Sequence, residues 1–370
     1  MSPVEGHVSP LLDRMAEAGA VFGDYHGRRL ARHFGDPAAE YGAATTSLAV
    51  FDRSHRTRLT VSGRAPGQML AGVLTGTIPG TPSTADDGVT RGAATYHAVL
   101  TPKGKMISDL QALLPGEESE PGFLLDVPVA GRAGLLETFA RVLPPRLARV
   151  ADVSATTSAL SVVGPHAASA LSRLALGLRV DAEELSSSGE GAWWRAGSVG
   201  EGPVVMRTKD VWPEAYDVFG PADAIVGLWR RLVDEGARPA GLGVWATLRV
   251  EGGRPVFGTD MDETTIPIEA GIHDRAIDHT KGCYTGQEVI VRIRDRGHVN
   301  KHLRTLVLGD VPTPPAGTEL FSAENPAKAV GRITSAVQSP RHGGVVALAY
   351  VRRGVERVTI DGTEVVVPVE

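Results

Sequence analysis

The chain of 370 residues contains very little cysteine and no long hydrophobic run. Its single cysteine, Cys283, cannot form an intramolecular disulfide, and this excludes a four-cysteine cluster held by the chain alone. No stretch approaches 18 consecutive apolar residues, and the first residues have neither the basic nor the apolar region of a signal peptide. We therefore expect a cytoplasmic protein without a membrane segment.

Neither sign of charge dominates the composition. Lys and Arg number 38 and Asp and Glu number 43, a net charge of −5 that does not suggest a dedicated nucleic-acid binder. Hydrophobic residues make up 42% and charged residues 22%, which excludes wholesale disorder. At this length, two or three domains are expected.

Several common catalytic motifs are also absent. The sequence has no H-E-x-x-H, no P-loop, no G-x-S-x-G and no glycine fingerprint of a dinucleotide-binding fold. The eleven histidines are scattered, so His279 or His298 could serve Cys283 as a base only if folding brings them close. A Cys–His protease-like dyad is a weakly supported alternative.

Glycine and proline are plentiful, at 44 and 25 residues, and their spread indicates many short strands joined by turns in an α+β protein. Residues 95–100 and 106–110 alternate like strands around a Pro-Lys-Gly turn, which predicts a β-hairpin. Apolar spacing predicts helices over 10–33 (with a break near Gly23), 130–142, 166–178 and 221–235. From Gly297 onward, four apolar or alternating runs separated by turn residues predict a small all-β barrel or sandwich.

The residues around Cys283 favour an ionised thiol. Lys281 lies two residues before it, and Thr285 and Glu288 have the spacing of a capping box that would begin a helix. A nearby cation or a helix N-terminus lowers a thiol pKa from about 8.5. The β-branched residues that follow also suit a strand, although we favour the helix. The alternative for the thiol is an ordinary buried cysteine that acts as a small hydrophobe.

Charge is distributed unevenly on the two sides of this segment. Residues 260–278 are rich in Asp and Glu, whereas residues 292–304 are rich in Arg and Lys. Such asymmetry can orient a bipolar ligand, or the two stretches can simply be solvated faces.

Several segments together carry a family resemblance. Residues 41–44, 50–54, 100–105, 241–243, 248–253, 266–271, 331–335 and 347–351 resemble signatures of the glycine-cleavage T-protein superfamily. One octet is similar to the K-G-C-[YF]-x-G-Q-E signature of the YgfZ folate-binding branch, through Lys281, Gly282, Cys283, Tyr284, Gly286, Gln287 and Glu288. The chain thus resembles the YgfZ branch along nearly its whole length.

The resemblance implies an α+β fold in a three-domain, T-protein-like cloverleaf. Residues 1–58 and 158–252 would form the first α+β domain, and residues 59–157 and 253–296 would form the second, interleaved with it. Residues 297–370 would form a C-terminal β-barrel.

The resemblance also implies a function. Tetrahydrofolate or a derivative would occupy a central channel of an accessory protein that supports assembly or repair of iron–sulfur cluster proteins, with an indirect link to tRNA modification. Cys283, with its thiol activated by Lys281, could supply one ligand to a cluster shared with client or carrier proteins. We expect no direct nucleic-acid or membrane partner.

Four residues are implied as folate ligands. Asp217, preferred to Glu214, would accept from the pterin N–H groups, and Arg249 would meet the acidic tail or pair with a core acid. Tyr96 and Glu269 complete the set.

Two departures from the T-protein pattern bear on catalysis. Ser108-Asp109 replaces an Asp-Asp pair, and residues 244–246 read Val-Trp-Ala where the superfamily has Ala-Arg-Asp. We therefore expect a protein that is not a true aminomethyltransferase. The alternative is a tetrahydrofolate-dependent aminomethyltransferase or demethylase with Asp109 as its acid–base group, and a module that only binds other molecules is a third interpretation.

Overall fold

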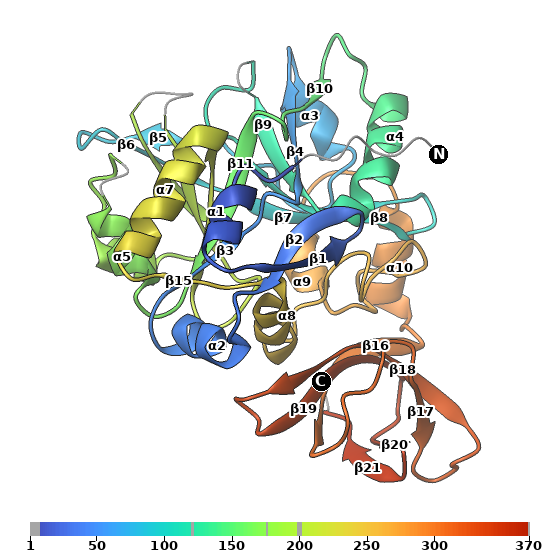
Figure 1. The fold of residues 1–370 in the computed structure, drawn as a ribbon. Helices are drawn as coiled ribbons and strands as arrows, with labels where there is room; N and C mark the ends of the chain where they lie inside the picture. The colour runs from blue at the N-terminus through green and yellow to red at the C-terminus, as the bar shows by residue number, and fades with distance from the viewer. Residues whose placement is uncertain (1–7, 120–121, 175–176, 198–201, 369–370) are drawn as a thin grey trace.

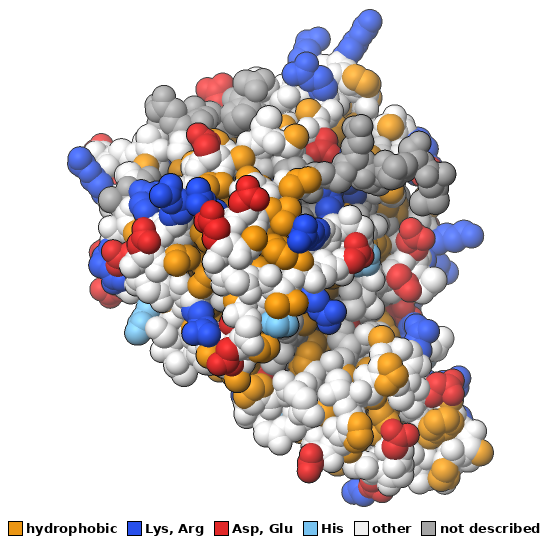
Figure 2. All heavy atoms as spheres, in the orientation of Figure 1, with side chains coloured by type: hydrophobic (Ala, Val, Ile, Leu, Met, Phe, Trp, Pro, Cys, Tyr) orange, Lys and Arg blue, Asp and Glu red, His pale blue; other side chains and the backbone are white. Residues whose placement is uncertain are grey.

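The computed structural model describes residues 8–119, 122–174, 177–197 and 202–368. Figure 1 shows a larger α+β body and a smaller C-terminal unit that extends from one side of it. On the face drawn in Figure 2, basic and acidic side chains are interspersed. Within the described ranges, no helix is long and apolar enough to cross a membrane.

The largest sheet has eight strands. In spatial order they are β15 (Arg238–Pro239), β3 (Ala49–Asp52), β11 (Thr157–Val163), β14 (Ala215–Pro221), β13 (Val204–Thr208), β12 (Ala192–Ala196), β6 (Val89–Ala93) and β5 (Ser83–Thr84). All neighbours pair antiparallel except β15 and β3, which are parallel. This sheet is the framework of the α+β body.

Helices cover both faces of this sheet. Successive residues of a strand point to opposite faces, so Val50 packs in one apolar cluster and Phe51 in another. The cluster around Val50 contains side chains of α1 (Leu12–Glu17), α5 (Ala167–Arg173), α6 (Ala182–Ser187) and α7 (Ala222–Asp234). The cluster around Phe51 contains side chains of α2 (Pro37–Thr46) and α8 (Leu242–Glu251).

A second sheet has five antiparallel strands. Their spatial order is β10 (Arg149–Asp152), β4 (Thr57–Ser62), β9 (Phe123–Val127), β8 (Met106–Leu113) and β7 (Thr95–Leu100). Helices α3 (Pro66–Ala71) and α4 (Arg132–Val142), the latter preceded by the 3₁₀ turn η1 (Val129–Gly131), pack on it through Leu70, Leu135 and Phe139. Leu113 packs with Trp193 and Met206 of the larger sheet, which joins the two sheets. The predicted hairpin is confirmed as β7 and β8.

The C-terminal unit is a curled antiparallel sheet of six strands. Its spatial order is β16 (Lys301–Gly309), β19 (Gly344–Arg352), β18 (Ala329–Ser339), β17 (Glu319–Ser322), β20 (Arg357–Ile360) and β21 (Thr363–Val366). The strands bury one apolar face, and the outer strands β16 and β21 approach each other, as in a half-barrel. The expected α+β class with a C-terminal barrel is confirmed, whereas the residue boundaries of the interleaved domains stay a prediction.

The predicted helix over 10–33 is largely wrong. Helix α1 ends at Glu17, and the chain then forms a hairpin of β1 (Val21–Tyr25) and β2 (Arg28–His33). The two turn residues, His26 and Gly27, both have positive φ, which is the geometry that matches the twist of a tight hairpin. The helix therefore does not continue past Gly19, which also has positive φ, although the helical spacing of the apolar residues does.

The other predicted helices fare better. Helices α4 and α7 confirm the predictions over 130–142 and 221–235, and α5 covers part of the prediction over 166–178, of which residues 175–176 lie outside the described residues. Two further helices follow in the chain, α9 (His273–Ala276) and α10 (Gln287–Arg296).

Candidate active site

A cavity of about 420 Å³ lies where the two sheets, the β1–β2 hairpin and α8 meet. Segments from distant parts of the chain line it: the loop after β3, strands β7 and β8, the loop before β14, and α9. Arginine is its most frequent charged residue, with six arginines against three aspartates: Arg32, Arg53, Arg56, Arg249, Arg254 and Arg275, and Asp24, Asp109 and Asp210. The cavity therefore favours a ligand with anionic groups.

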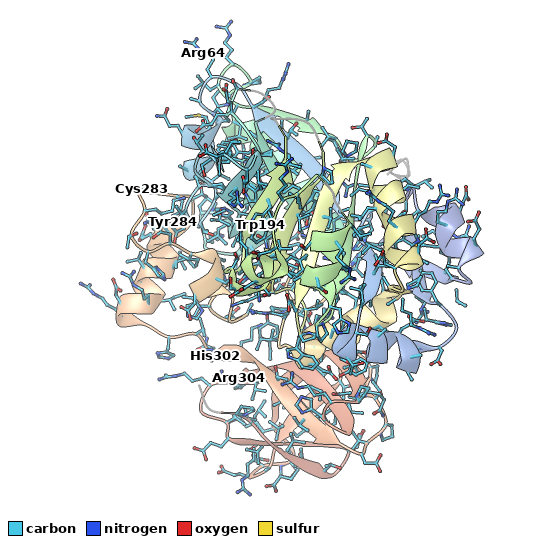
Figure 3. The ribbon with its side chains drawn as sticks, turned by 90° about the vertical axis from the view of Figure 1, so that its left-hand side faces the viewer. Arg64, Trp194, Cys283, Tyr284, His302 and Arg304 are labelled. Atoms are coloured by element: carbon cyan, nitrogen blue, oxygen red, sulfur yellow. The ribbon has the colours of Figure 1, made fainter. Side chains whose placement is uncertain are left out.

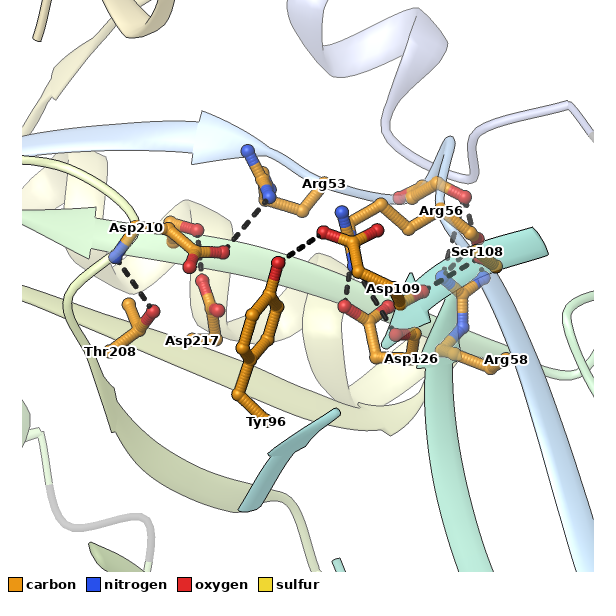
Figure 4. Close-up of polar contacts among 12 residues, drawn as sticks. Arg53, Arg56, Arg58, Tyr96, Ser108, Asp109, Asp126, Thr208, Asp210 and Asp217 are labelled. Atoms are coloured by element: carbon orange, nitrogen blue, oxygen red, sulfur yellow. Dashed lines mark hydrogen bonds and ion pairs between the residues drawn. The ribbon is translucent and has the colours of Figure 1, made fainter. Parts of the chain in front are cut away.

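Asp109 is the buried carboxylate of this cavity. Its Oδ2 accepts a hydrogen bond of 2.6 Å from the Tyr96 hydroxyl, and its Oδ1 is buried without a partner among the described residues (Figure 4). Burial raises the pKa of Asp109, while the Tyr96 hydrogen bond and the charge of Arg56 act in the opposite direction. Burial also raises the pKa of Tyr96 well above its usual value, so its hydroxyl stays a donor. Asp109 is thus placed to exchange a proton at Oδ1.

Ser108, the residue that departs from the Asp-Asp pair, points to the other face of β8. Its side chain is fully buried, and its hydroxyl donates 2.8 Å to the carbonyl of Asp109. A Cβ added at Gly131 would lie only 2.0 Å from Ser108 Oγ, so this side chain packs tightly beneath the turn η1. Since neighbouring strand residues face opposite sides, the serine removes no carboxylate from the cavity.

Buried cations surround Asp109. Arg56 forms an ion pair with Asp126, and both side chains are largely buried (Figure 4). Arg53 stacks on Trp245, with its guanidinium carbon 3.8 Å from the ring centroid, and one nitrogen lies 4.0 Å from Asp210. Trp245 is the residue that breaks the family pattern after the glycines at 241 and 243, and it supplies an aromatic wall to the cavity.

Three of the predicted folate ligands line the cavity or lie near it. Tyr96 and Arg249 line it, but the Arg249 guanidinium is already engaged by Asp260 and by Ser335, each at 2.7 Å. Asp217 lies on β14 outside the lining and accepts a hydrogen bond from Ser161. Burial raises the pKa of Asp217 to about 6.

Glu269 does not join this group. It lines a separate groove beside the C-terminal unit, together with Lys301 and Arg352, and its Oε2 accepts from the backbone N–H of Ile266 at 3.1 Å.

The octet 281–288 forms an outer loop and the first residues of α10, and none of its residues lines the cavity. Cys283 is exposed, and Figure 3 shows it at the edge of the molecule. The Lys281 ammonium donates to the carbonyls of Leu74 and Gly76, at 2.6 and 2.9 Å. It thereby ties the loop to the five-stranded sheet region, and activation of the thiol by Lys281 stays a prediction.

The helix expected after Cys283 is confirmed as α10, but its predicted cap is wrong. The N-cap is Gly286, with φ +85° and no side-chain cap. The Thr285 hydroxyl instead points to the carbonyl of Gly72, 3.4 Å away. A Cβ at Gly286 would meet the carbonyl oxygen of Thr101 at 2.6 Å, so glycine is required for this close approach to the β7–β8 turn.

Sequence reasoning missed much of the charged lining: Arg53, His55, Arg56, Asp210 and Arg275. Two of these residues, Arg53 and His55, lie in or beside the segment 50–54 that carries the family resemblance, and this was the available signal. Burial and the surrounding arginines lower the pKa of His55 well below its usual value, so its imidazole is neutral. Its Nδ1 is buried without a partner among the described residues.

Comparison with known proteins identifies the family. Residues 11–281 match the GCVT N-terminal domain, and residues 301–370 match the glycine cleavage T-protein C-terminal barrel domain. The chain belongs to the glycine-cleavage T-protein (GcvT) superfamily. Within that superfamily, it is 30% identical to the aminomethyltransferase of Rubrobacter xylanophilus over 93% of this chain and 86% of that one.

Further relatives agree. The aminomethyltransferase of Bacillus subtilis is 27% identical over 93% of this chain and 90% of its own length. The crystal structure of the glycine cleavage system aminomethyltransferase T from Bartonella henselae superimposes with a TM-score of 0.79, at 20% identity, over 98% of this chain and 96% of that one. This last similarity establishes the GcvT fold.

These findings overturn the expected function. The relatives that align with most of the chain are named aminomethyltransferases, so the assignment to the YgfZ branch, the role in iron–sulfur assembly and the expectation of a chain that is not an aminomethyltransferase are wrong. The YgfZ-like signature spans only eight residues outside the cavity, whereas Asp109 and Tyr96 line the cavity. The expected iron–sulfur cluster, shared with client proteins through Cys283, rested on the YgfZ assignment and is no longer supported.

Proposed function

We propose that this GcvT-superfamily chain is a tetrahydrofolate-dependent aminomethyltransferase whose reaction takes place in the cavity around Asp109. The observation that carries the proposal is the buried Asp109 carboxyl, which keeps one oxygen free while Tyr96 holds the other. The relatives named aminomethyltransferase support it across most of the chain.

The cavity residues fit a folate. Besides Asp109 Oδ1, three buried polar atoms of lining residues have no partner among the described residues: Arg53 Nε, His55 Nδ1 and Gln111 Nε2. Such atoms cost free energy unless a ligand supplies hydrogen bonds, and a pterin carries donors and acceptors on one flat ring. Tyr25, Trp245 and Phe257 offer the apolar surfaces that a flat ring needs.

Different residues of the cavity have different roles in the proposed one-carbon transfer. Tetrahydrofolate, when bound, supplies the nitrogen that accepts the one-carbon unit. Asp109 holds or receives a proton at Oδ1, and Tyr96 fixes the orientation of the carboxyl through Oδ2. The charges of Arg56 and Arg275 lower the pKa of Asp109 and so favour its ionised form, and Trp245 helps to exclude water from the cavity.

The acidic tail of the folate should meet Arg32 and Arg254. Both arginines line the cavity, and neither has an ion-pair partner among the described residues, whereas Arg249 is occupied by Asp260. Replacing Arg254 by alanine should weaken the binding of a folate with several glutamates by up to about fivefold more than that of a monoglutamate, because a charge pair open to solvent is worth up to about 1 kcal/mol. Isothermal titration with both forms measures this difference. Equal losses for the two ligands would place the tail elsewhere.

The thiol should be dispensable for transfer. Replacing Cys283 by alanine is expected to leave kcat and the folate dissociation constant within about twofold, since exposed substitutions away from a site usually change little. Steady-state rates and calorimetry of the variant test this. A loss of activity beyond tenfold would mean that Cys283 takes part in the transfer reaction.

Direct titration tests the binding half of the proposal. Calorimetry with 5-formyltetrahydrofolate, a stable folate, should show one site per chain. Replacing Trp245 by alanine should weaken this site by about tenfold or more, since loss of one stacked ring costs about 1–3 kcal/mol by analogy with aromatic stacking elsewhere. Absence of any heat of binding at millimolar ligand would contradict the proposal.

A further inference from the structure

The cavity shares a wall with a second hollow. This hollow, of about 350 Å³, is lined in part by Gly76, Ala94, Glu190 and Asp278. Three residues line both spaces: Tyr96, Gln111 and Arg275. The Arg275 guanidinium stacks on the Tyr96 ring, so the partition includes side chains, which can rotate, and Tyr96 is the residue that holds Asp109.

The two spaces carry opposite charge. Arginines outnumber aspartates two to one in the cavity. In the second hollow, the carboxylates of Glu190, Asp274 and Asp278 face a single cation, Arg275. Hydrogen bonds from Thr280 and Thr77 lower the pKa of Asp278, so it stays ionised. Asp274 is almost fully exposed at the mouth, and its Oδ1 lies 3.4 Å from His273 Nε2.

Ion pairs hold Arg275 in the partition. Its guanidinium binds Glu190 and, at 2.7 Å, Asp210, and it stacks 4.1 Å from the centroid of the Tyr96 ring. Glu190 precedes β12, Asp210 precedes β14, and Arg275 lies on the single turn α9, so three separate segments meet in this contact. Despite burial, the charges of Arg275, Arg56 and Arg53 lower the pKa of Asp210 to about 2.

Gln111 gives an independent sign that a ligand reaches this wall. Its side chain is 3% exposed, yet its Nε2 donor has no partner among the described residues. A buried amide donor without a partner costs free energy, which a ligand oxygen at the partition would recover.

We propose that Arg275 gates a second, acid-lined entrance to the cavity, and that this entrance admits the substrate that carries a positively charged amine. The inference rests on the proposed transferase function, because an aminomethyl group bears such an amine. Folate, which is anionic, enters through the arginine-lined side, and the amine approaches from the opposite side. When Arg275 swings toward Glu190 and away from Asp210, the wall opens beside Tyr96 and Asp109.

The charge of a labelling reagent can identify the entrance that the reagent uses, because one entrance is lined mainly by arginines and the other mainly by carboxylates. In a chain with Cys283→Ser, we would place a single thiol in the wall by Gln111→Cys and measure its modification by two methanethiosulfonates. One reagent carries a 2-aminoethyl cation and the other a 2-sulfonatoethyl anion. Adding Arg275→Ala should raise the rate of the cationic reagent by about tenfold or more and leave the anionic rate within about twofold, since charged clefts change encounter rates by factors of 10 or more.

Two further variants and one ligand sharpen the test. Arg275→Lys should give a cationic rate between those of the parent and Arg275→Ala, and Asp274→Asn with Asp278→Asn should remove the gain. Bound 5-formyltetrahydrofolate should block the anionic reagent and spare the cationic one. Equal gains for both reagents, or none for the cation in a chain that melts as the parent does, would overturn the gate. The labelling without folate is independent of the transferase proposal, which the titration of the parent chain tests separately.

Discussion

Replacing Asp109 by asparagine should lower kcat by about 10²–10⁴, the usual contribution of a positioned acid–base group. Asparagine keeps the size of the side chain and can still accept the Tyr96 hydrogen bond, but it cannot exchange a proton at neutral pH. Steady-state rates with saturating tetrahydrofolate measure the loss. Binding of 5-formyltetrahydrofolate should persist, which would separate catalysis from affinity.

The pH profile provides a second test of Asp109. The ionised carboxylate is the form that accepts a proton, so activity should be present above its pKa and fall as pH decreases through it. Because burial raises this pKa, the acidic limb should lie above the ordinary aspartate range, and Asp109→Asn should lack it. Asp24→Asn, which also changes a carboxylate of the cavity lining, is the matched control and should retain the limb. Equal losses for both variants would mean that Asp109 has no special role.

Replacing Arg56 by methionine should lower the free energy of unfolding by about 3–5 kcal/mol, because it strands the buried carboxylate of Asp126. It should also move the acidic limb of activity to higher pH, since the charge of Arg56 lowers the pKa of Asp109. Urea denaturation measures the first effect, and the pH profile measures the second.

Two further variants serve as controls for the loss of stability in Arg56→Met. Arg64→Met removes an exposed arginine (Figure 3) and should change stability by less than about 0.5 kcal/mol. Arg56→Met combined with Asp126→Leu should recover much of the stability, because no buried charge is then left unpaired. If Arg56→Met alone costs less than about 1 kcal/mol, the Arg56–Asp126 pair behaves as an exposed ion pair, and its loss leaves no buried charge unpaired.

Local patterns predicted the elements whose cause is local. The β7–β8 hairpin follows from alternation around a Pro-Lys-Gly turn, and α7 follows from its apolar stripe. The β1–β2 hairpin was missed because its apolar residues happen to suit helical spacing, while the deciding feature is a tight turn at His26 and Gly27. The residue boundaries of the two interleaved domains depend on long-range sheet pairing and stay a prediction.

The site was predicted only where the family resemblance pointed to it. Asp109 and Tyr96 were named in this way, and the cavity contains both. Arg53, Asp210 and Arg275 lie more than 60 residues apart in the chain, and they meet only because β3 and β14 belong to one sheet and α9 packs beside them. The octet around Cys283 does not line the cavity, and its position could not be predicted because local charge says nothing about where a loop lies in the fold.

Transfer of the one-carbon unit itself tests the central claim most directly. The purified chain would be added to a glycine cleavage system that lacks its own aminomethyltransferase, with tetrahydrofolate and glycine labelled with ¹³C at the methylene carbon. We predict that the label appears in 5,10-methylenetetrahydrofolate with the parent chain and with Cys283→Ala, and is lost with Asp109→Asn. Absence of labelled folate with a parent chain that binds 5-formyltetrahydrofolate would contradict the transferase assignment.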